Sequence, residues 1–218
     1  MQTDPAKKSP PVIVTESRQY DSSPPSMTDS NSSADLRVLV VDDEKEVADA
    51  YALRLRGFCS FETAYGGRDA LAAVEDETID VVLLDRRMPE LSGDEVLAEL
   101  EERGYRGRVI MVTAIDPELD VLELPFDDYL CKPVDQEDLR EAVDQQRRVL
   151  AYDLLGEYFS AQSKREVIEA ELPPETRTDH EGYQSVSTRA DTLRGRVSRL
   201  LGDTSALEAF ENIDRGKL

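Results

Sequence analysis

Acidic side chains follow two apolar runs of this sequence at the point where each run stops. Asp42 and Asp43 come directly after "LRVLVV" (36–41), and Asp85 closes "IDVVLLD" (79–85). Three carboxylates brought to one place repel one another and take up a proton unless a cation joins them. Mg²⁺ is the fitting ion, because it binds carboxylate and phosphate oxygens while it keeps several waters. The sequence therefore predicts a magnesium site built from these carboxylates.

A hydroxyl and an ammonium follow two further runs. Thr113 lies near the end of "RVIMVTA" (108–114), and Lys132 lies near the end of "DYLCKP" (128–133). A carboxylate beside a bound cation can attack phosphorus and become an aspartyl phosphate. Thr113 and Lys132 would then hold the phosphoryl oxygens by a hydrogen bond and by charge.

Strands that alternate with helices must position these residues. The strands are expected at 36–41, 58–65, 79–85, 108–114 and 128–133. The helices are expected at 44–57, 66–77, 92–104 and 135–146, the last with Asp135 as its N-cap. This order predicts an α/β fold with a doubly wound, five-stranded parallel sheet. Ligands of such sheets bind beyond the carboxyl ends of the strands, where the polar side chains stand.

The motifs agree in order with those of a known family, and residues 36–146 resemble the response-regulator receiver domain, which has a flavodoxin-like fold. The matching stretches are "VLVVDDE", "LLDRRMPELSG", "MVTA" and "DDYLCKP". The resemblance implies that Asp85 accepts a phosphoryl group from a histidine kinase. It also implies that Thr113 and Lys132 assist this transfer, with a cis bond between Lys132 and Pro133.

The same resemblance implies a metal site and a switch. Mg²⁺ would be bound by Asp42, Asp43, Asp85 and the backbone carbonyl of Arg87. The switch would consist of Thr113 and the aromatic ring of Tyr129, while Met88-Pro89 and Gly93 shape the loop after Asp85.

One stretch departs from the family pattern. Receivers usually carry a full helix between the positions of Thr113 and Tyr129, but residues 114–128 read "AIDPELDVLELPFDD". Pro117 and Pro125 predict that this helix is short or irregular. Many receivers dimerise through this face on activation, so the departure speaks against the usual phosphorylation-driven dimer.

Two classes of enzyme lack their required residues here. Phosphatases of the haloacid-dehalogenase type need a second aspartate two residues after the nucleophile, and that position is Arg87. A P-loop would need a GxxxxGK[ST] stretch, which the sequence does not contain. We expect a phosphoacceptor signalling protein rather than an enzyme, with at most self-catalysed phosphoryl transfer and autodephosphorylation.

Residues 147–218 predict a separate helical domain. Apolar residues recur at helical spacing at Leu150, Leu154, Tyr158, Ala161, Ile168 and Leu172, and a heptad seam follows at Val186, Ala190, Leu193, Val197 and Leu200. Pro173-Pro174 separates the two patterns, which predicts an antiparallel helical hairpin. The stretch "LLGEYFSAQSKREVIEAEL" resembles the HalX-type regulators of haloarchaea. A third helix with a basic recognition face, as in helix-turn-helix proteins, is not apparent.

Composition limits the partners. The chain has 47 acidic and 26 basic residues and a net charge of −21, most of it in residues 36–144. Such a surface repels nucleic acid and itself, which favours an origin in a high-salt proteome.

Cys59 and Cys131 are expected to be small core residues. Since apolar runs of about 18 residues are absent, we expect a cytoplasmic protein without a membrane span. Residues 1–35, rich in Ser and Pro, are expected to be disordered.

The sequence therefore predicts a two-component response regulator whose phosphorylation switches a helical effector module. The C-terminal helices would pair as a homodimer or bind a downstream protein. Two alternatives stay open: a DNA-binding transcriptional regulator with an unrecognised contact surface, and a stand-alone phosphorelay carrier.

Overall fold

The structure is a computed structural model that describes residues 36–218, apart from 77, 115–116, 118, 203 and 212–218. The expected disordered segment 1–35 lies outside these residues. The strands are β1 (Arg37–Val41), β2 (Ser60–Ala64), β3 (Val81–Leu84), β4 (Arg108–Thr113) and β5 (Asp128–Cys131). The helices are α1 (Lys45–Leu55), α2 (Gly67–Asp76), α3 (Gly93–Glu102), η2 (Leu119–Glu123), α4 (Gln136–Glu171), α5 (Pro174–Arg177), α6 (Glu181–Leu201) and α7 (Ser205–Glu211).

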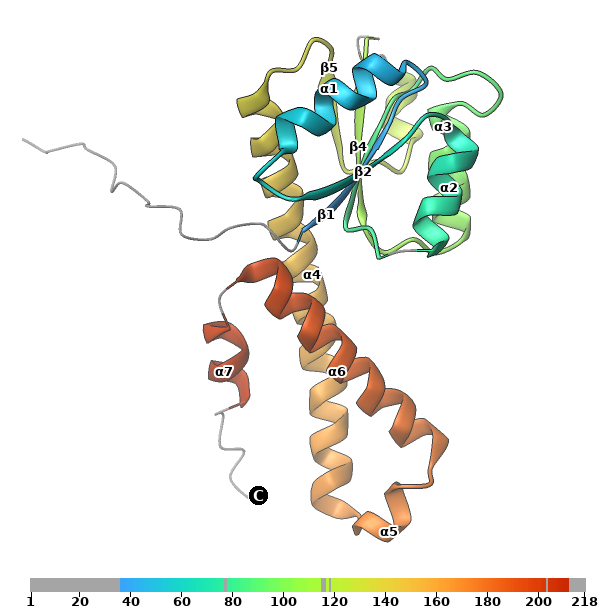
Figure 1. The fold of residues 1–218 in the computed structure, drawn as a ribbon. Helices are drawn as coiled ribbons and strands as arrows, with labels where there is room; N and C mark the ends of the chain where they lie inside the picture. The colour runs from blue at the N-terminus through green and yellow to red at the C-terminus, as the bar shows by residue number, and fades with distance from the viewer. Residues whose placement is uncertain (1–35, 77, 115–116, 118, 203, 212–218) are drawn as a thin grey trace, which may run out of the picture. The chain divides into compact units, whose positions relative to one another are not determined.

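The strands form one parallel sheet of five strands in the order β2-β1-β3-β4-β5 (Figure 1). β1 pairs with both β2 and β3, so that Val41 lies between Ala64 and Leu84. The continuous apolar runs of β1, β3 and β4 are buried because helices cover both faces of the sheet. The doubly wound, flavodoxin-like fold predicted from the sequence is confirmed.

Alternate side chains of β1 enter two different cores, as the period of a strand requires. Val38 and Val40 pack with α1 and α4 on one face of the sheet. Leu39 and Val41 pack with α2 and α3 on the other face, in what we call the second core. The helix pairs flank the sheet in the same way in Figure 1.

Side-chain caps define where two of the helices begin. The Ser92 hydroxyl accepts the N–H of Glu95 at the start of α3, and the Glu95 carboxylate in turn accepts the N–H of Ser92. The Asp135 carboxylate accepts the N–H of Asp138 at 2.9 Å, which confirms Asp135 as the N-cap of α4. These caps fix the starts of two of the helices that begin beyond the carboxyl edge of the sheet.

The connection from β4 to β5 is irregular, as Pro117 and Pro125 predict. Its described part holds a single 3₁₀ turn, η2. Leu119 and Leu122 on this turn are exposed.

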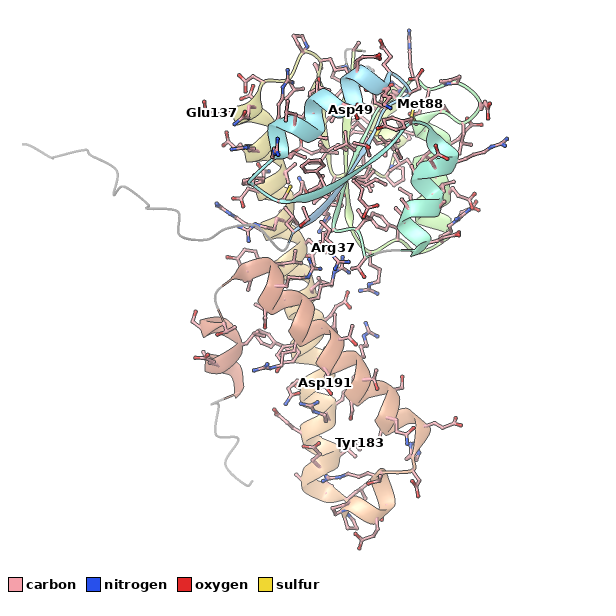
Figure 2. All side chains as sticks on the ribbon, in the orientation of Figure 1. Arg37, Asp49, Met88, Glu137, Tyr183 and Asp191 are labelled. Carbon is pink, nitrogen blue, oxygen red and sulfur yellow. The ribbon has the colours of Figure 1, made fainter. Side chains whose placement is uncertain are left out.

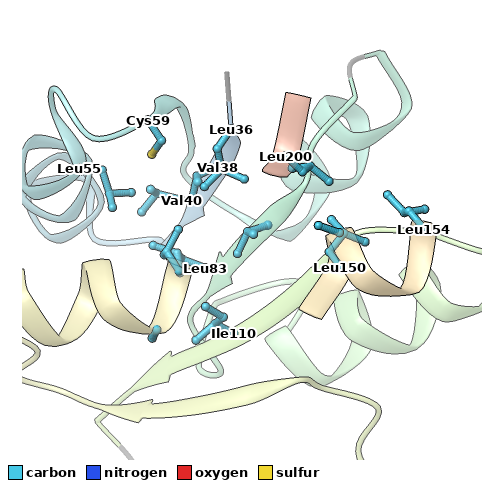
Figure 3. Close-up of a cluster of buried hydrophobic side chains, with 14 of the residues drawn as sticks. Leu36, Val38, Val40, Leu55, Cys59, Leu83, Ile110, Leu150, Leu154 and Leu200 are labelled. Carbon is cyan, nitrogen blue, oxygen red and sulfur yellow. The ribbon is translucent and has the colours of Figure 1, made fainter. Parts of the chain in front are cut away.

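α4 runs for 36 residues and joins the sheet to the C-terminal helices. Its first part packs Leu139 and Val143 under the sheet, and its middle packs Leu150 and Leu154 against α6. One buried cluster contains the side chains of both parts together with Leu200 of α6 (Figure 3). The boundary expected after residue 146 falls within this helix, which continues through it without a break.

α6 returns antiparallel along α4. Glu157 of α4 bonds Arg189 of α6, and Arg147 near the start of the pair donates to the carbonyl of Leu200 near the end of α6. The predicted seam is buried at Ala190, Leu193, Val197 and Leu200. At the far end of the predicted α4 stripe, Ile168 and Leu172 are exposed by 37% and 40%, so the apolar contact weakens towards the turn.

A buried carboxylate at the start of β3 links the sheet to α6. Asp80 is fully buried and bonds Arg196 at 3.2 Å and Arg199 at 2.6 Å. It also accepts the backbone N–H of Arg37 at 3.1 Å. A buried carboxylate is tolerated because these donors compensate for its lost hydration. We call Asp80, Arg196 and Arg199 the Asp80 cluster.

The two cysteines differ in burial. Cys59 is buried, and burial raises the pKa of its thiol to about 12. Cys131 is exposed, so the expectation that it belongs to the core is wrong. The reason is position, because Cys131 is the last residue of β5, which lies at the edge of the sheet.

Candidate functional site

Two carboxylates and one ammonium from three different strands meet at the carboxyl edge of the sheet. The Lys132 Nζ donates to Asp42 Oδ2 at 2.6 Å and to Asp85 Oδ1 at 2.7 Å. Asp42 follows β1, Asp85 follows β3 and Lys132 follows β5. All three side chains are largely buried. The fold thus joins residues that are 47 to 90 positions apart in the sequence.

This meeting point is the topological switch of the sheet. β1 pairs with β3, and their connections lead to opposite sides, towards β2 and towards β4. The strand ends therefore leave a crevice between the two connecting loops, the usual ligand site of this sheet class. Met88, in the loop after β3, lies at this edge, at the opposite end of the sheet from Arg37, which begins β1 (Figure 2).

The loop after Asp85 is held by close backbone contacts. The N–H of Arg87 donates to Asp85 Oδ2 at 2.8 Å, and the N–H of Gly93 donates to the carbonyl of Arg86 at 2.9 Å. A side chain at Gly93 would collide with the backbone oxygen of Asp85 and lie 2.8 Å from the Cα of Arg86. Met88 is buried in the second core and anchors the loop. Position 93 therefore requires glycine.

The charges of the site perturb one another. Burial raises the pKa of Asp85 and the nearby Asp42 adds to this rise, although hydrogen bonding and charge from Lys132 work against it. Burial alone would lower the pKa of Lys132, but its hydrogen bonds to Asp42 and Asp85 raise it on balance. The two aspartates therefore favour the ammonium form of Lys132, and the carboxyl group of Asp85 is held in a partly desolvated place.

Thr113 and Tyr129 lie on neighbouring strands beside this group. Thr113 ends β4 and is buried, and its carbonyl accepts the N–H of Lys132 at 2.8 Å. Tyr129 in β5 is partly buried against the second core, with its ring 5.6 Å from that of Phe126. The peptide bond between Lys132 and Pro133 is cis.

The donors available for a metal ion are carboxylates and backbone oxygens, which suit Mg²⁺. Asp43 directly follows Asp42 and is partly exposed at this edge. Among the described residues no group of three His, Cys, Asp or Glu side chains is arranged to hold a metal ion. Asp42 and Asp85 instead converge on the Lys132 ammonium. The donor types fit Mg²⁺, and binding it would require the Lys132 ammonium to share these carboxylates with the metal.

Sequence reasoning missed the Asp80 cluster. The signal was present, because Asp80 interrupts the apolar run "IDVVLL", and a carboxylate inside a buried strand needs a partner. The partners themselves could not be found in this way, since Arg196 and Arg199 lie 116 and 119 residues further along the chain.

Comparisons with known proteins agree with both parts of the chain. Residues 38–144 match the response regulator receiver domain, and residues 148–214 match the HalX domain. A Haloferax volcanii protein named as a transcriptional regulator is 41% identical over 159 residues, which cover 72% of this chain and 27% of that protein. The transcriptional regulatory protein CutR of Streptomyces coelicolor is 41% identical over 102 residues, which cover 45% of this chain and 47% of CutR. The chain thus spans less than half the length of these relatives.

Among solved structures, the signal receiver domain of a LuxO repressor protein from Vibrio parahaemolyticus is similar in fold. It has a TM-score of 0.52 and 24% identity, and the match covers 56% of this chain and 97% of that domain. Among the described residues, none of the helices combines the length and the apolar character that a membrane span requires.

Proposed function

Because the chain belongs to the response-regulator receiver family over residues 38–144 and carries a HalX domain over residues 148–214, we propose that it is a two-component response regulator phosphorylated on Asp85 by a histidine kinase. The observation that carries this proposal is the convergence of Asp42, Asp85 and Lys132 at the switch point of the sheet. The receiver domain marks a signalling protein rather than a dedicated enzyme. The cytoplasmic location expected from the sequence is part of the proposal.

Each residue would have a distinct part in the transfer. Asp85 would attack the phosphorus of the donor with a carboxylate oxygen, and the bond to the leaving group would break as the new acyl phosphate bond forms. Lys132 would keep its contact with Asp42 and hold a phosphoryl oxygen by charge. Thr113 would donate its hydroxyl to another phosphoryl oxygen, and its movement would let Tyr129 change position.

The metal would be held by Asp42, Asp43, Asp85 and the backbone carbonyl of Arg87. Mg²⁺ would supply positive charge to the phosphoryl oxygens, which eases the approach of the anionic Asp85. Asp42 and Asp43 would otherwise repel the incoming phosphoryl group. In the phosphorylated chain the same residues would favour self-catalysed hydrolysis.

The direct test is phosphorylation of the full chain by a small acyl phosphate donor in molar KCl with MgCl₂, followed by separation on a phosphate-affinity gel. We expect one shifted band with Mg²⁺ and none after chelation with EDTA. Asp85→Asn should abolish the band and Asp43→Asn should weaken it. Asp49→Asn, which changes an exposed aspartate of α1, should leave it unchanged. A band that survives in the Asp85→Asn chain would contradict the proposal.

The relatives' names favour one alternative output, the regulation of transcription through DNA contact. Three of the four arginines of α6 give this little support, because Arg189 bonds Glu157 while Arg196 and Arg199 bond Asp80. We propose that the C-terminal helices act by protein contact, as a homodimer or on a downstream protein. A mobility shift of duplex DNA by the phosphorylated chain would favour the DNA-binding alternative instead.

A further inference from the structure

The side of α4 that faces away from α6 carries an unusual set of residues. Val149, Tyr152, Gly156, Phe159, Ser163 and Val167 follow one another at spacings of three and four, so they share one helical face. We call these six residues the outer stripe, of which Phe159 is partly buried, since it also packs against the first buried cluster with its ring 5.7 Å from that of Tyr158. The residues that pack on α6, such as Leu150, Leu154 and Tyr158, lie about half a turn around the helix from it.

The outer stripe is apolar and exposed at both of its ends. Tyr152 is 65% exposed, Val167 57% and Val149 38%. The six positions hold no charged residue, although 33% of the chain is charged. The solvent face of a helix normally carries its charges. In α4, charged side chains such as Arg148 and Glu166 lie at the border of the outer stripe instead.

Gly156 lies in the middle of the outer stripe, and no contact with the described residues of its own chain explains why this position is a glycine. Glycine destabilises the interior of a helix relative to alanine. A side-chain carbon at position 156 would meet no described atom within 4 Å. Glycine at such a place allows another backbone or a bulky side chain to come close. Gly195 of α6 also has open space, but its neighbours one turn away include Asp191 and Arg199, so it lies on a polar face.

We propose that the outer stripe is a helix–helix interface with a second copy of this chain, and that the two α4 helices pair antiparallel. Arg148 and Glu166 border the same side of the stripe at its opposite ends, where Arg148 pairs with Asp144 and Glu166 accepts a hydrogen bond from Gln162 of the same chain. In an antiparallel pair centred near Gly156, Arg148 of each chain meets Glu166 of the other. The same centre sets Phe159 of each chain over the gap at Gly156 of the other.

This pairing covers apolar side chains that one chain leaves exposed, namely Val149, Tyr152 and Val167. Tyr152 and Val149 of one copy would lie along Ser163 and Val167 of the second copy, which removes apolar surface from water. The interface is isologous, since the same surface serves both chains, as two-fold dimers require. The inference rests on the proposed role of the C-terminal helices in protein contact and not on the phosphoryl chemistry.

The first test is sedimentation equilibrium of the full chain in molar KCl. We expect a two-chain mass that falls to the single-chain mass on dilution. Tyr152→Glu, Val167→Glu and Gly156→Leu should each weaken the dimer about tenfold or more, because each puts charge or bulk into the buried surface of the interface. Leu122→Glu in η2 and Gly195→Leu in α6 are the matched controls and should leave the dissociation constant unchanged.

Two results would overturn the inference: a single-chain mass at every concentration, or a dimer that Tyr152→Glu and Val167→Glu leave intact. Far-ultraviolet circular dichroism checks that each variant is folded. Phosphorylation of Asp85 in the same variants separates the two proposals, since a monomer that still accepts phosphate contradicts only the dimer.

Disulfide crosslinking tests the direction of the helices, with Cys131→Ser as the background because Cys131 is exposed. A mixture of Val149→Cys and Val167→Cys chains should form a mixed disulfide dimer, while each variant alone should not. Crosslinking of each variant with itself, without a mixed product, would overturn the antiparallel arrangement.

Discussion

Lys132 is the residue on which the site depends, because it separates two carboxylates that would otherwise repel each other. Its ammonium lies within 2.7 Å of both Asp42 and Asp85. Burial raises the pKa of Asp85, the hydrogen bond and charge of Lys132 lower it, and the charge of Asp42 raises it further. The same three groups would bind the phosphoryl oxygens, so the balance among them determines how readily Asp85 reacts.

This balance predicts opposite shifts for two variants. In metal-free buffer Lys132→Ala should raise the pKa of Asp85, because a favourable positive charge is lost. Asp42→Asn should lower it, because a repelling negative charge is lost. The measurement is a titration of the Asp85 carboxyl carbon by nuclear magnetic resonance. Shifts in the same direction for both variants would contradict this account of the site.

The close backbone contacts at Gly93 predict that any side chain at this position would displace the loop after Asp85. Gly93→Ala would force a methyl group against the backbone of Asp85 and Arg86, and neither backbone can yield without moving the phosphoacceptor. We expect a loss of about 1–3 kcal/mol in the free energy of unfolding, measured with denaturant.

The matched control is Gly195→Ala, where the space is open. Alanine there should stabilise α6 by about 0.5–1 kcal/mol. Equal effects of the two substitutions would show that the close contact at Gly93 is absent in solution.

At the scale of elements, β3 stands between two carboxylates with different partners. Asp85 beyond its end meets Lys132, and Asp80 before its start meets Arg196 and Arg199 of α6. The strand therefore connects the phosphoacceptor edge of the sheet to the C-terminal helices within a few residues. The Asp80 cluster fixes the end of α6 against the sheet.

Removing Asp80 should be costly. Asp80→Ala leaves two arginines without their buried carboxylate, and loss of one member of a buried ion pair costs about 3–5 kcal/mol. We expect the lower end of that range, since Arg196 and Arg199 are 17% and 23% exposed. Chemical denaturation measures the loss.

Asp49→Ala is the control, because Asp49 is exposed and bonds only Tyr65 among the hydrogen bonds of the described residues. It should change the free energy of unfolding by less than about 0.5 kcal/mol. A loss at Asp80 no larger than that at Asp49 would mean that the Asp80 cluster does not hold the two elements together.

Sequence analysis predicted the strands and helices that have strong local patterns. It did not predict the contacts between residues that lie far apart in the chain. The apolar runs of β1, β3 and β4 and the N-cap at Asp135 are local signals, and the structure confirms them. Cys131 was misjudged because an edge strand and a central strand read alike in a single sequence. The Asp80 cluster escaped prediction because its arginines come from the last long helix.

The location of the candidate site could also be predicted from the sequence, for a physical reason. All parallel strands end at one edge, so polar residues that follow buried runs must meet there. The hydrogen bonds of Lys132 to both carboxylates could not be predicted, since they depend on how far β5 extends beside β4.

At the scale of the whole molecule, net charge should control stability. The chain carries −21, and most of this charge lies on the receiver part. Self-repulsion weakens as the Debye length falls from about 10 Å at 0.1 M salt to about 3 Å at 1 M. The melting temperature should therefore rise from dilute to molar KCl at fixed Mg²⁺. Equal melting temperatures across this range would contradict adaptation to high salt.

The central claim is that Asp85 is the phosphoacceptor, and chemical trapping tests it most directly. The full chain is treated with an acyl phosphate donor and Mg²⁺ in molar KCl and then reduced with borohydride, which converts an aspartyl phosphate into homoserine. Mass spectrometry of the peptides should find homoserine at position 85 and aspartate at positions 42 and 43. Homoserine at another position, or phosphate on a serine or threonine with position 85 unchanged, would contradict the account.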